Sequence, residues 1–302
     1  LDLVELQRTV AEGAALDQQP PPARGHSIEA RLYAEDPAKD WQPQAGAVHR
    51  FAVPTAVARF GAIERSGVRV DAGIEDGSVI SVFYDPMIAK VISYAPTRRQ
   101  AAALLADALV RTRMHGVDTN RDLLVNVLRH QAFLTGATDT AFFDAHGLAE
   151  LARPVADDRT TELSAVAAAL ADAALNRDTA TVFAGVPSGW RNLGSIPQHK
   201  GYQDSQGRTL EVRYRVHRDG VRIEGHDDVT VSSATHERVV LATGGVERAF
   251  DACRYGSDVF VDSPAGSVRL TALPRYPDPD AALAHGSLVA PMPGSVLRVG
   301  AA

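Results

Sequence analysis

The period of the hydrophobic pattern changes in the middle of this chain, and that change constrains the fold more than any other feature. Over residues 161–176 apolar side chains recur as they do along a helix, in a segment rich in alanine. Over residues 210–272 apolar and polar residues alternate in short runs, with turn dipeptides such as Asp219-Gly220 and Gly244-Gly245 between them. One helix followed by about seven or eight evenly spaced strands predicts a small antiparallel β-barrel or a curved sheet.

Residues 1–150 predict strands first and helices after them, which is an α+β arrangement. A helix that ends at Gly13 opens the chain. Strand-like runs follow at residues 27–33, 47–53, 68–72 and 79–83. Thr97 and Thr119 each begin a helix, because a Gln or an Asp stands three residues later, at the spacing of a capping box. The residues expected to be buried are Ala101, Leu104, Leu105, Ala108 and Leu109 in the first helix and Leu123, Leu124, Val127 and Leu128 in the second.

The composition is that of an ordinary globular protein, and it excludes two classes of partner. Of the 302 residues, 45% are hydrophobic and 23% are charged, and the chain is long enough for more than one domain. A formal net charge of −6 argues against nucleic acid binding, which needs clustered Lys and Arg. No apolar run reaches the roughly 18 residues of a membrane-spanning helix. We therefore expect neither nucleic acid nor a membrane as a partner.

The single cysteine, Cys253, cannot form an internal disulfide. One buried and inert thiol fits a reducing compartment, so we predict a cytoplasmic protein. The first residues lack the basic start and apolar core of a signal peptide. They also lack an initiator Met, so we expect the natural chain to begin earlier.

The generic motifs of nucleotide, nucleophile and metal sites do not occur in the sequence. It contains no G-x-G-x-x-G, P-loop, G-x-S-x-G or paired C-x-x-C. His26 and Glu29 resemble half of a metal site, but a structural site needs around four ligands, and we expect no metal to be held here. We expect Trp41 and Trp190 to be core or interface anchors.

Four motifs between residues 24 and 120 carry the specific signal. Residues 24–37 read RGHSIEARLYAEDP, residues 68–73 VRVDAG, residues 84–91 YDPMIAKV and residues 116–120 GVDTN. In this order and at this spacing they resemble the C-terminal part of biotin carboxylases.

Two further segments extend this resemblance. Residues 290–299, APMPGSVLRV, resemble the opening of a biotinyl carrier domain. The layout of the middle of the chain, together with SGWRN at residues 188–192, resembles the domain that ties the carboxylase to its partner subunit in acyl-CoA carboxylases. The chain thus resembles the C-terminal part of the α subunit of such an enzyme, of the 3-methylcrotonyl-CoA or propionyl-CoA carboxylase type.

The resemblance implies an α+β fold in several parts. We expect the C-terminal subdomain of an ATP-grasp biotin carboxylase over residues 1–152. A helix with a small antiparallel β-barrel, the partner-binding or BT-like domain, would follow over residues 153–275. A linker at residues 276–287 would then lead to the first strand of a biotinyl carrier domain within residues 288–302.

The resemblance also implies a reaction and a catalytic residue. Biotin carboxylases use ATP to activate bicarbonate and attach the carboxyl group to a ureido nitrogen of biotin. Loss of the nitrogen-bound proton leaves negative charge on the ureido oxygen, which a fixed guanidinium would stabilise. Arg suits this role better than Lys, because it stays charged and presents a rigid fork. By its place in the motif, Arg69 is the candidate; the alternative is an ordinary ion pair with Asp71 or Glu75.

We expect structural roles for the other residues of these motifs. Arg31 lies near Glu29 and Glu35, which favours an ion-pair network. Lys90 is expected to cap a strand end, and the alternative is that it helps to position the site. Tyr84, Asp85 and Met87 surround Pro86 and are expected to form and pack a turn that orients the sheet.

The implied cofactors are biotin, ATP, Mg²⁺ or Mn²⁺, and bicarbonate. In the family, the ATP lid, the metal-binding glutamates and the general base precede a segment like residues 1–4, and the biotinylated lysine follows the APMPG motif by a few tens of residues. None of these groups is among the 302 residues. We therefore expect these residues alone neither to bind Mg-ATP productively nor to carry biotin.

The implied partner is a carboxyltransferase β subunit, and contacts between two biotin carboxylase copies are also expected. We expect the β subunit to dock on an apolar face of the barrel rimmed by Arg213, Arg215 and Trp190-Arg191, unless these arginines form an ordinary solvated strand face. The compact middle segment favours the 3-methylcrotonyl-CoA type. The alternatives are a non-catalytic assembly module, a propionyl-CoA or acetyl-CoA carboxylase α chain and, with less support, a pyruvate or urea carboxylase.

Overall fold

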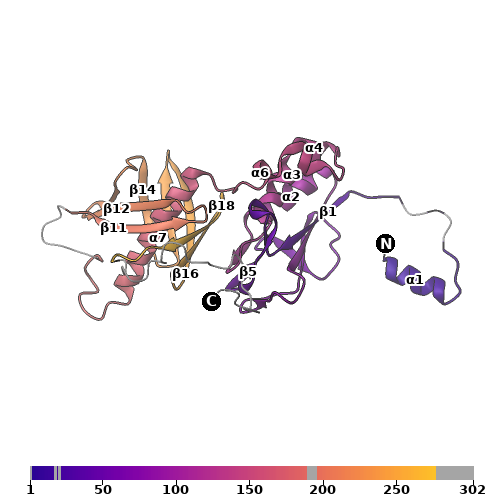
Figure 1. Cartoon of the computed structure of the whole chain (residues 1–302), viewed down its shortest axis with the longest axis horizontal. Coiled ribbons are helices and arrows are strands. Elements are labelled where there is room, and N and C mark those ends of the chain that lie inside the picture. The colour runs from indigo at the N-terminus through magenta and orange to yellow at the C-terminus, as the bar shows by residue number, and fades with distance from the viewer. Residues whose placement is uncertain (1, 17–18, 20–21, 189–195, 277–302) are drawn as a thin grey trace, which may run out of the picture.

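The computed structural model describes residues 2–16, 19, 22–188 and 196–276, and these form two folded units and one separate helix (Figure 1). The separate helix is α1 (Leu3–Ala11), which lies apart from both units. Asp2 caps its N-terminus, because its carboxylate accepts hydrogen bonds from two backbone amides of the first turn, those of Val4 and Glu5. No residue of α1 is buried against the rest of the described chain.

The first unit is built on a four-stranded sheet with the strand order β1-β9-β7-β6. Its strands are β1 (His26–Tyr33), β6 (Ala56–Arg59), β7 (Gly67–Ala72) and β9 (Met87–Ala95). β9 pairs antiparallel with both β1 and β7, whereas β6 and β7 are parallel.

One face of this sheet forms the core of the first unit. Side chains alternate along each strand, so every second residue points towards helix α2 (Arg98–Val110). The buried residues that strands β1, β7 and β9 and helix α2 contribute to this core are Ala30, Leu32, Val68, Val70, Ala89, Val91, Ala102, Leu105 and Leu109. The opposite face of the sheet is not covered by α2, and it carries the charged residues of the motifs.

Short elements complete the first unit. The strands are β2 (Glu35–Asp36), β3 (Gln42–Pro43), β4 (Gly46–Ala47), β5 (Arg50–Ala52), β8 (Val79–Ile80) and β10 (Arg113–His115). The helices are η1 (Pro37–Lys39), α3 (Arg121–Arg129), α4 (Gln131–Thr135), α5 (Phe142–His146) and α6 (Leu148–Leu151). β5 and β10 pair into a two-stranded antiparallel ribbon of their own, which faces the second unit.

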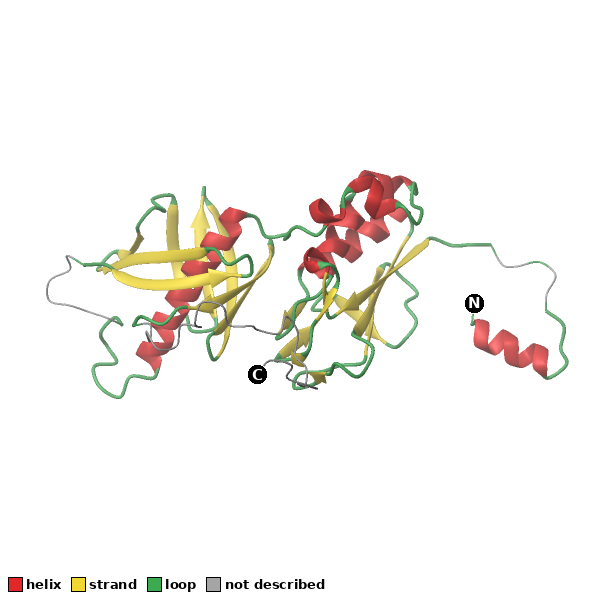
Figure 2. Cartoon of the chain, in the orientation of Figure 1, coloured by secondary structure: helices red, strands yellow, loops and turns green. Residues whose placement is uncertain are grey.

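The second unit is an eight-stranded antiparallel sheet curled around one helix (Figure 2). Its strand order is β13-β12-β11-β18-β17-β16-β15-β14. The strands are β11 (Gln198–Asp204), β12 (Thr209–His217), β13 (Gly220–Ile223), β14 (Val229–Ala234), β15 (Arg238–Thr243), β16 (Val246–Tyr255), β17 (Asp258–Ser263) and β18 (Gly266–Ala272). The two end strands, β13 and β14, lie near each other without forming a ladder, so the sheet is a nearly closed barrel.

The helix inside the curl is α7 (Asp158–Asp178), whose N-terminus is capped by Asp157 through a 2.7 Å hydrogen bond from the amide of Thr160. Every residue from 163 to 171 is buried, which means that this stretch is covered on all sides. Alanine dominates the stretch, and its small side chains let the strands approach the helix closely. This arrangement confirms the prediction of a helix followed by a small barrel or curved sheet.

Several sequence predictions were wrong or incomplete. Leu104 is 36% exposed instead of buried. Helix α3 begins after Asn120, without the capping box expected at Thr119. The strand expected at residues 79–83 ends at Ile80, and the run at residues 47–53 divides into β4 and β5. The expected carrier strand and nearly all of the expected linker lie in residues 277–302, outside the described residues.

Candidate functional site

The charged residues of the motifs lie together on the open face of the first sheet. β1, β9 and β7 are neighbours, and their register aligns Arg31 with Lys90 and Lys90 with Asp71. The next row on the same face holds Glu29 and Arg69, with Ile92 between them. Residues far apart in the sequence thus form one charged surface, because each occupies the outward position of its strand.

Arg69 is held by its neighbour Asp71 in a bidentate ion pair. Nε of Arg69 donates to Oδ1 of Asp71 at 2.8 Å, and Nη2 donates to Oδ2 at 2.6 Å. Oδ1 also accepts a 3.0 Å hydrogen bond from the backbone amide of Phe60. These contacts lower the pKa of Asp71 below its usual value: the hydrogen bond from Arg69 has the largest effect, and burial opposes it. Of the two partners expected for Arg69, the structure has Asp71.

This geometry leaves Arg69 able to stabilise an anion. The side chain is 31% exposed, and within the described part of the chain no hydrogen bond engages its Nη1. Asp71 therefore fixes the plane of the guanidinium while a charged donor group stays available. Such a preoriented donor is suited to a negative charge that develops on a bound oxygen atom.

Arg31 and Lys90 lie on the same sheet face as the Arg69–Asp71 pair, but they are not part of that bidentate pair. Arg31 forms an ion pair with Glu29 at 2.9 Å, and both side chains are well exposed, at 57% and 39%. The expected partner Glu29 is confirmed, but the pair lies at the surface and is not an internal network. The prediction that Lys90 holds a strand end is wrong, because Lys90 lies inside β9 between Arg31 and Asp71. Its positive charge contributes to lowering the pKa of Asp71.

The segment before β9 is a turn, as its Pro86 predicts. Asp85 accepts a 2.8 Å hydrogen bond from the amide of Met87 through Oδ1, and the carbonyl of Pro86 accepts one from Ala34 at 2.9 Å. These bonds attach the start of β9 to the end of β1. Tyr84 is 85% exposed and makes no contribution to the core.

Asn120 holds the sheet in a way that the sequence analysis did not identify. It is only 5% exposed, its Oδ1 accepts from the amide of Tyr33 at 2.9 Å, and its Nδ2 donates to the carbonyl of Arg31 at 3.1 Å. The side chain therefore completes the hydrogen bonds at the end of β1. The GVDTN motif was the available signal, because a buried Asn in a turn needs several partners.

His26, Glu29 and Trp41 take separate places in the first unit. His26 and Glu29 are three residues apart on β1, so their side chains point to opposite faces of the strand. In the ranges that the structure describes, no three His, Cys, Asp or Glu side chains gather as a metal site would require. Trp41 packs edge-on against Phe143 with the ring centroids 6.0 Å apart, and Trp190 lies outside the described residues.

The arginines expected to rim a docking face are paired on strand β12. Arg213 donates to Glu211 at 3.0 Å, and Arg215 forms an ion pair with Glu224 at 2.9 Å. This is the alternative that the sequence left open, a solvated strand face. Trp190-Arg191, the rest of the expected rim, lies outside the described residues.

A cleft of about 1140 Å³ lies between the two units, away from Arg69. Its charged lining is paired internally, as in Arg121 with Asp122 at 2.8 Å and Arg208 with Asp204 at 2.7 Å. Because these charged groups are already paired, few of them are available to bind a ligand. We therefore assign no ligand to the cleft.

Nothing in the described helices is long and apolar enough to span a membrane.

Comparisons with known proteins match the two units separately. Residues 29–145 match the family model of the biotin carboxylase C-terminal domain. Residues 160–275 match the model of the BT domain of the methylcrotonyl-CoA carboxylase alpha subunit. The first unit therefore resembles the C-terminal domain of a biotin carboxylase, and the second unit resembles a BT domain.

Individual relatives agree with this assignment. The mitochondrial methylcrotonoyl-CoA carboxylase subunit alpha of Glycine max is 39% identical over 145 residues, which cover 47% of this chain and 19% of the relative. The same subunit of Mus musculus is 27% identical over 329 aligned positions, which cover 99% of this chain and 43% of the relative. The chain thus spans less than half the length of either relative.

A solved structure is also similar to about half of this chain. The biotin carboxylase domain dimer of Hydrogenobacter thermophilus 2-oxoglutarate carboxylase, in complex with MgADP, ADP and bicarbonate, is 31% identical, with a TM-score of 0.43. The similarity covers 51% of this chain and 32% of that one. From the motifs and the two matching families, the chain resembles the C-terminal part of the α subunit of a biotin-dependent acyl-CoA carboxylase.

Proposed function

We propose that this chain serves a biotin-dependent acyl-CoA carboxylase in two ways. The open face of the first sheet would form part of the site where carrier-bound biotin is carboxylated, and the barrel would dock the carboxyltransferase β subunit. The observation that supports the first role is the Arg69–Asp71 pair, a charged fork held in place on an otherwise open surface. The match of the second unit to a BT domain supports the second role.

In the carboxylation step, Arg69 would act as an electrostatic stabiliser. Biotin, ATP, a divalent cation and bicarbonate supply the ureido group and the activated carboxyl group when they are bound. Arg69 would hold the ureido oxygen and stabilise the negative charge that develops on it. Asp71 would keep the guanidinium oriented, so that little reorganisation is needed during the reaction.

The substitution Arg69→Gln in the full-length subunit tests this role. We expect kcat for biotin carboxylation to fall by roughly 10²–10³, as with the loss of an oxyanion donor in other enzymes. Arg69→Lys should recover only part of the rate, because an ammonium group cannot form the bidentate contact with Asp71. The assay is bicarbonate- and biotin-dependent release of phosphate from ATP, with thermal unfolding measured alongside.

Arg31→Gln is the matched control for this experiment. It removes an arginine from the same sheet face, but one whose partner Glu29 is exposed. The control should retain most of the activity. If Arg69→Gln stays within about twofold of the wild-type rate, or if the two variants lose activity equally, Arg69 is not the stabilising group.

The second part of the proposal assigns the docking surface to one end of the barrel. The segment between α7 and β11 exposes Val182 at 70%, Phe183 at 84% and Ile196 at 62%. Phe183 has a φ of 55°, which is uncommon for a residue with a side chain. Val182 and Phe183 are adjacent, and exposed apolar and aromatic groups of this kind are typical anchors of a protein interface.

The double substitution Val182→Asp with Phe183→Asp should abolish co-purification with a co-expressed carboxyltransferase β subunit. Buried charges at the centre of an interface are strongly unfavourable, whereas an isolated barrel should tolerate them on an exposed segment. Val246→Asp is the control, because Val246 is 52% exposed at the start of β16. Retained co-purification in the double variant, or its loss in the control alone, would contradict the assignment.

The family match of the second unit indicates the acyl-CoA substrate more specifically than the matches of the first unit do. Matches to the first unit include methylcrotonoyl-CoA and pyruvate carboxylases, so that unit does not discriminate between acyl groups. The BT domain match favours the methylcrotonyl-CoA type over the propionyl-CoA and acetyl-CoA alternatives. A non-catalytic assembly module remains the second candidate, which intact mass and a streptavidin blot of the natural protein would test. The cytoplasmic location stays a prediction, and several relatives are named as mitochondrial.

A further inference from the structure

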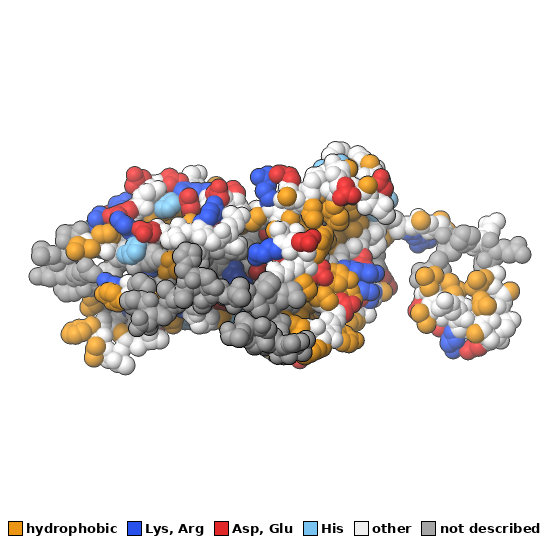
Figure 3. All heavy atoms as spheres, viewed as in Figure 1, with side chains coloured by type: hydrophobic (Ala, Val, Ile, Leu, Met, Phe, Trp, Pro, Cys, Tyr) orange, Lys and Arg blue, Asp and Glu red, His pale blue; other side chains and the backbone are white. Residues whose placement is uncertain are grey.

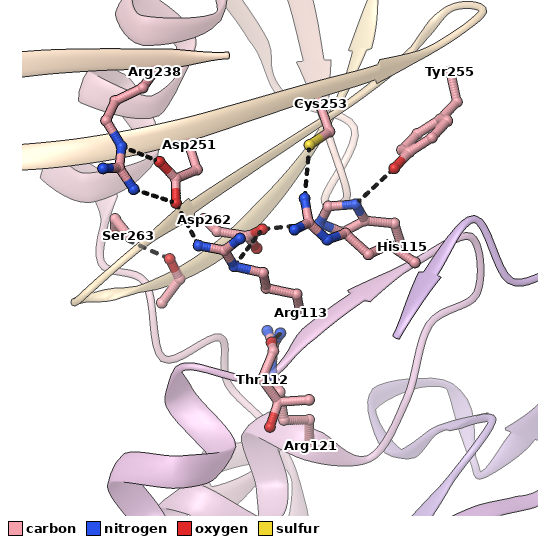
Figure 4. A network of polar contacts seen from close by, with 12 residues as sticks. Thr112, Arg113, His115, Arg121, Arg238, Asp251, Cys253, Tyr255, Asp262 and Ser263 are labelled. Carbon is pink, nitrogen blue, oxygen red and sulfur yellow. Dashed lines mark hydrogen bonds and ion pairs between the residues drawn. The ribbon is translucent and has the colours of Figure 1, made fainter. Parts of the chain in front are cut away.

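The ribbon formed by β5 and β10 contacts the outer face of the barrel through polar and aromatic side chains (Figure 4). His115, at the end of β10, is fully buried, and both of its ring nitrogens face residues of the barrel. Its Nε2 lies 3.0 Å from Oδ2 of Asp262, and its Nδ1 lies 3.2 Å from the hydroxyl of Tyr255. A proton on Nε2 lets the ring donate to Asp262 and accept from Tyr255.

Aromatic stacking surrounds this histidine. The His115 ring stacks on Phe260 of β17 with the centroids 4.6 Å apart and the planes at 20°. His49, next to β5, stacks on Tyr255 at 4.3 Å and 9°. Both partners on the barrel side come from neighbouring strands, β16 and β17. The ribbon is therefore fitted to one region of the barrel by shape as well as by charge.

Arg113 links the ribbon to two carboxylates of the barrel. Its Nη2 donates to Asp251 of β16, and its Nε lies 3.9 Å from Asp262 of β17. The side chains are mostly buried, with Arg113 24% and Asp251 17% exposed. On the barrel side, Arg238 also donates to Asp251 at 2.5 Å. The carboxylate of Asp251 is therefore shared by two arginines, one from each unit.

Two contacts at the edges extend the same surface. Arg50 of β5 approaches the sulfur of Cys253 with its Nη1 at 3.6 Å. Arg269 of β18 donates to Asp118 of the first unit at 3.5 Å. Opposite charges and stacked rings from the two units thus face each other along three barrel strands, β16, β17 and β18.

We propose that this interface is a specific latch, centred on His115, which makes the carboxylase subdomain and the barrel move as a single body. Separation of the units would expose these side chains to water and would remove the ring stacking and the charge-assisted hydrogen bonds between the units, so these contacts favour the docked state. A partner bound to the barrel would then have a fixed orientation relative to the open face of the first sheet, which carries Arg69. This inference does not depend on which partner the barrel binds.

Cys253 provides a native probe of the latch, because it is the chain's only cysteine and lies at the contact. We expect its alkylation by N-ethylmaleimide, followed by peptide-resolved mass spectrometry, to be slow in the wild-type protein. His115→Leu removes both polar contacts, and it should raise the alkylation rate by roughly tenfold or more. His115→Gln, which retains a donor and is milder, should give a smaller increase and serves if the first variant does not fold.

Two measurements separate opening of the latch from unfolding of the barrel. The alkylation rate in the variant should depend weakly on urea, because opening exposes little surface, and amide exchange in β12, which is not one of the contacting strands, should stay slow. Arg213→Gln, which breaks an exposed pair on β12, is the control and should leave the rate unchanged. Fast alkylation of wild-type Cys253, or an unchanged rate in both folded His115 variants, would overturn the proposal.

Discussion

At the scale of single residues, Gly116 is a position where the backbone leaves no room for a side chain. It follows the buried His115 and begins the GVDTN turn. Its φ is 128°, and a Cβ placed on it would lie 2.0 Å from the carbonyl oxygen of Ala47. The turn that brings Asn120 to the end of β1 therefore requires glycine at this position.

The substitution Gly116→Ala should reduce the free energy of unfolding by roughly 2–4 kcal/mol, as the sum of an unfavourable φ and a steric overlap with the backbone. Gly136→Ala is the matched control. Gly136 also has a positive φ, of 82°, but no atom lies within 4 Å of an added Cβ, so it should cost only roughly 1–2 kcal/mol. Urea unfolding at neutral pH measures both, and equal losses would argue against the steric contribution.

At the scale of elements, the barrel strands were predictable and the central strand of the first sheet was not. Strands β12 and β18 alternate apolar and polar residues, which is the pattern of a sheet covered on one face, and most of the turns between the barrel strands contain a glycine. β9 has buried residues at neighbouring as well as alternate positions, and its sequence MIAKVISYA hides the period of two. The polar β11, with a glycine at position 201, lacks an apolar signal and depends on the ladders to β12 and β18.

The helix α7 was predicted from its alanines, but its role was not. A helix covered on all sides shows no single apolar stripe, so its environment cannot be read from a period of 3.6 residues. One buried charge positions it: Asp172, whose side chain is 11% exposed, pairs with Lys200 of β11 and with Arg254 of β16. These partners come from strands far along the chain, which no local pattern identifies.

The candidate site was predictable only where its contacts are local. Arg69 and Asp71 are two residues apart on one strand, so an ion pair on a common face follows from the sequence. The interface between the units was not predictable, because Arg113 and His115 meet partners 138 and 147 residues further along. Only the folded barrel brings Asp251 and Asp262 to the same side.

At the scale of the whole molecule, the interface connects stability to pH through Asp262. Burial raises the pKa of this carboxyl group, but the hydrogen bond and charge of His115, together with Ser267 and Arg113, outweigh it and lower the pKa below its usual value. A carboxyl group with a lowered pKa stabilises the fold above its unfolded pKa of about 4, and this contribution is lost as the pH falls through the folded pKa.

Asp262→Asn should therefore destabilise the protein at pH 7 and make its stability less dependent on pH below about 4. Urea unfolding of the wild type and the variant between neutral and acidic pH measures the difference. Asp219→Asn is the control, because Asp219 has a lowered pKa too but pairs with Arg222 at a fully exposed hairpin, where solvent screens the charges. If both variants reduce the pH dependence of the unfolding free energy at acidic pH equally, burial at the interface is not the cause.

The alanine-rich α7 fills the inside of the curled sheet, and this limits what the barrel can do. Barrels of similar size that carry small molecules keep a hollow centre. Here α7 fills the interior of the barrel, so binding sites can form only on its outer surface and at its ends. Figure 3 shows that the outside of this unit carries mixed acidic and basic groups on the visible face. Such a scaffold is rigid, and substitutions on its surface can change its binding partners while its core stays the same.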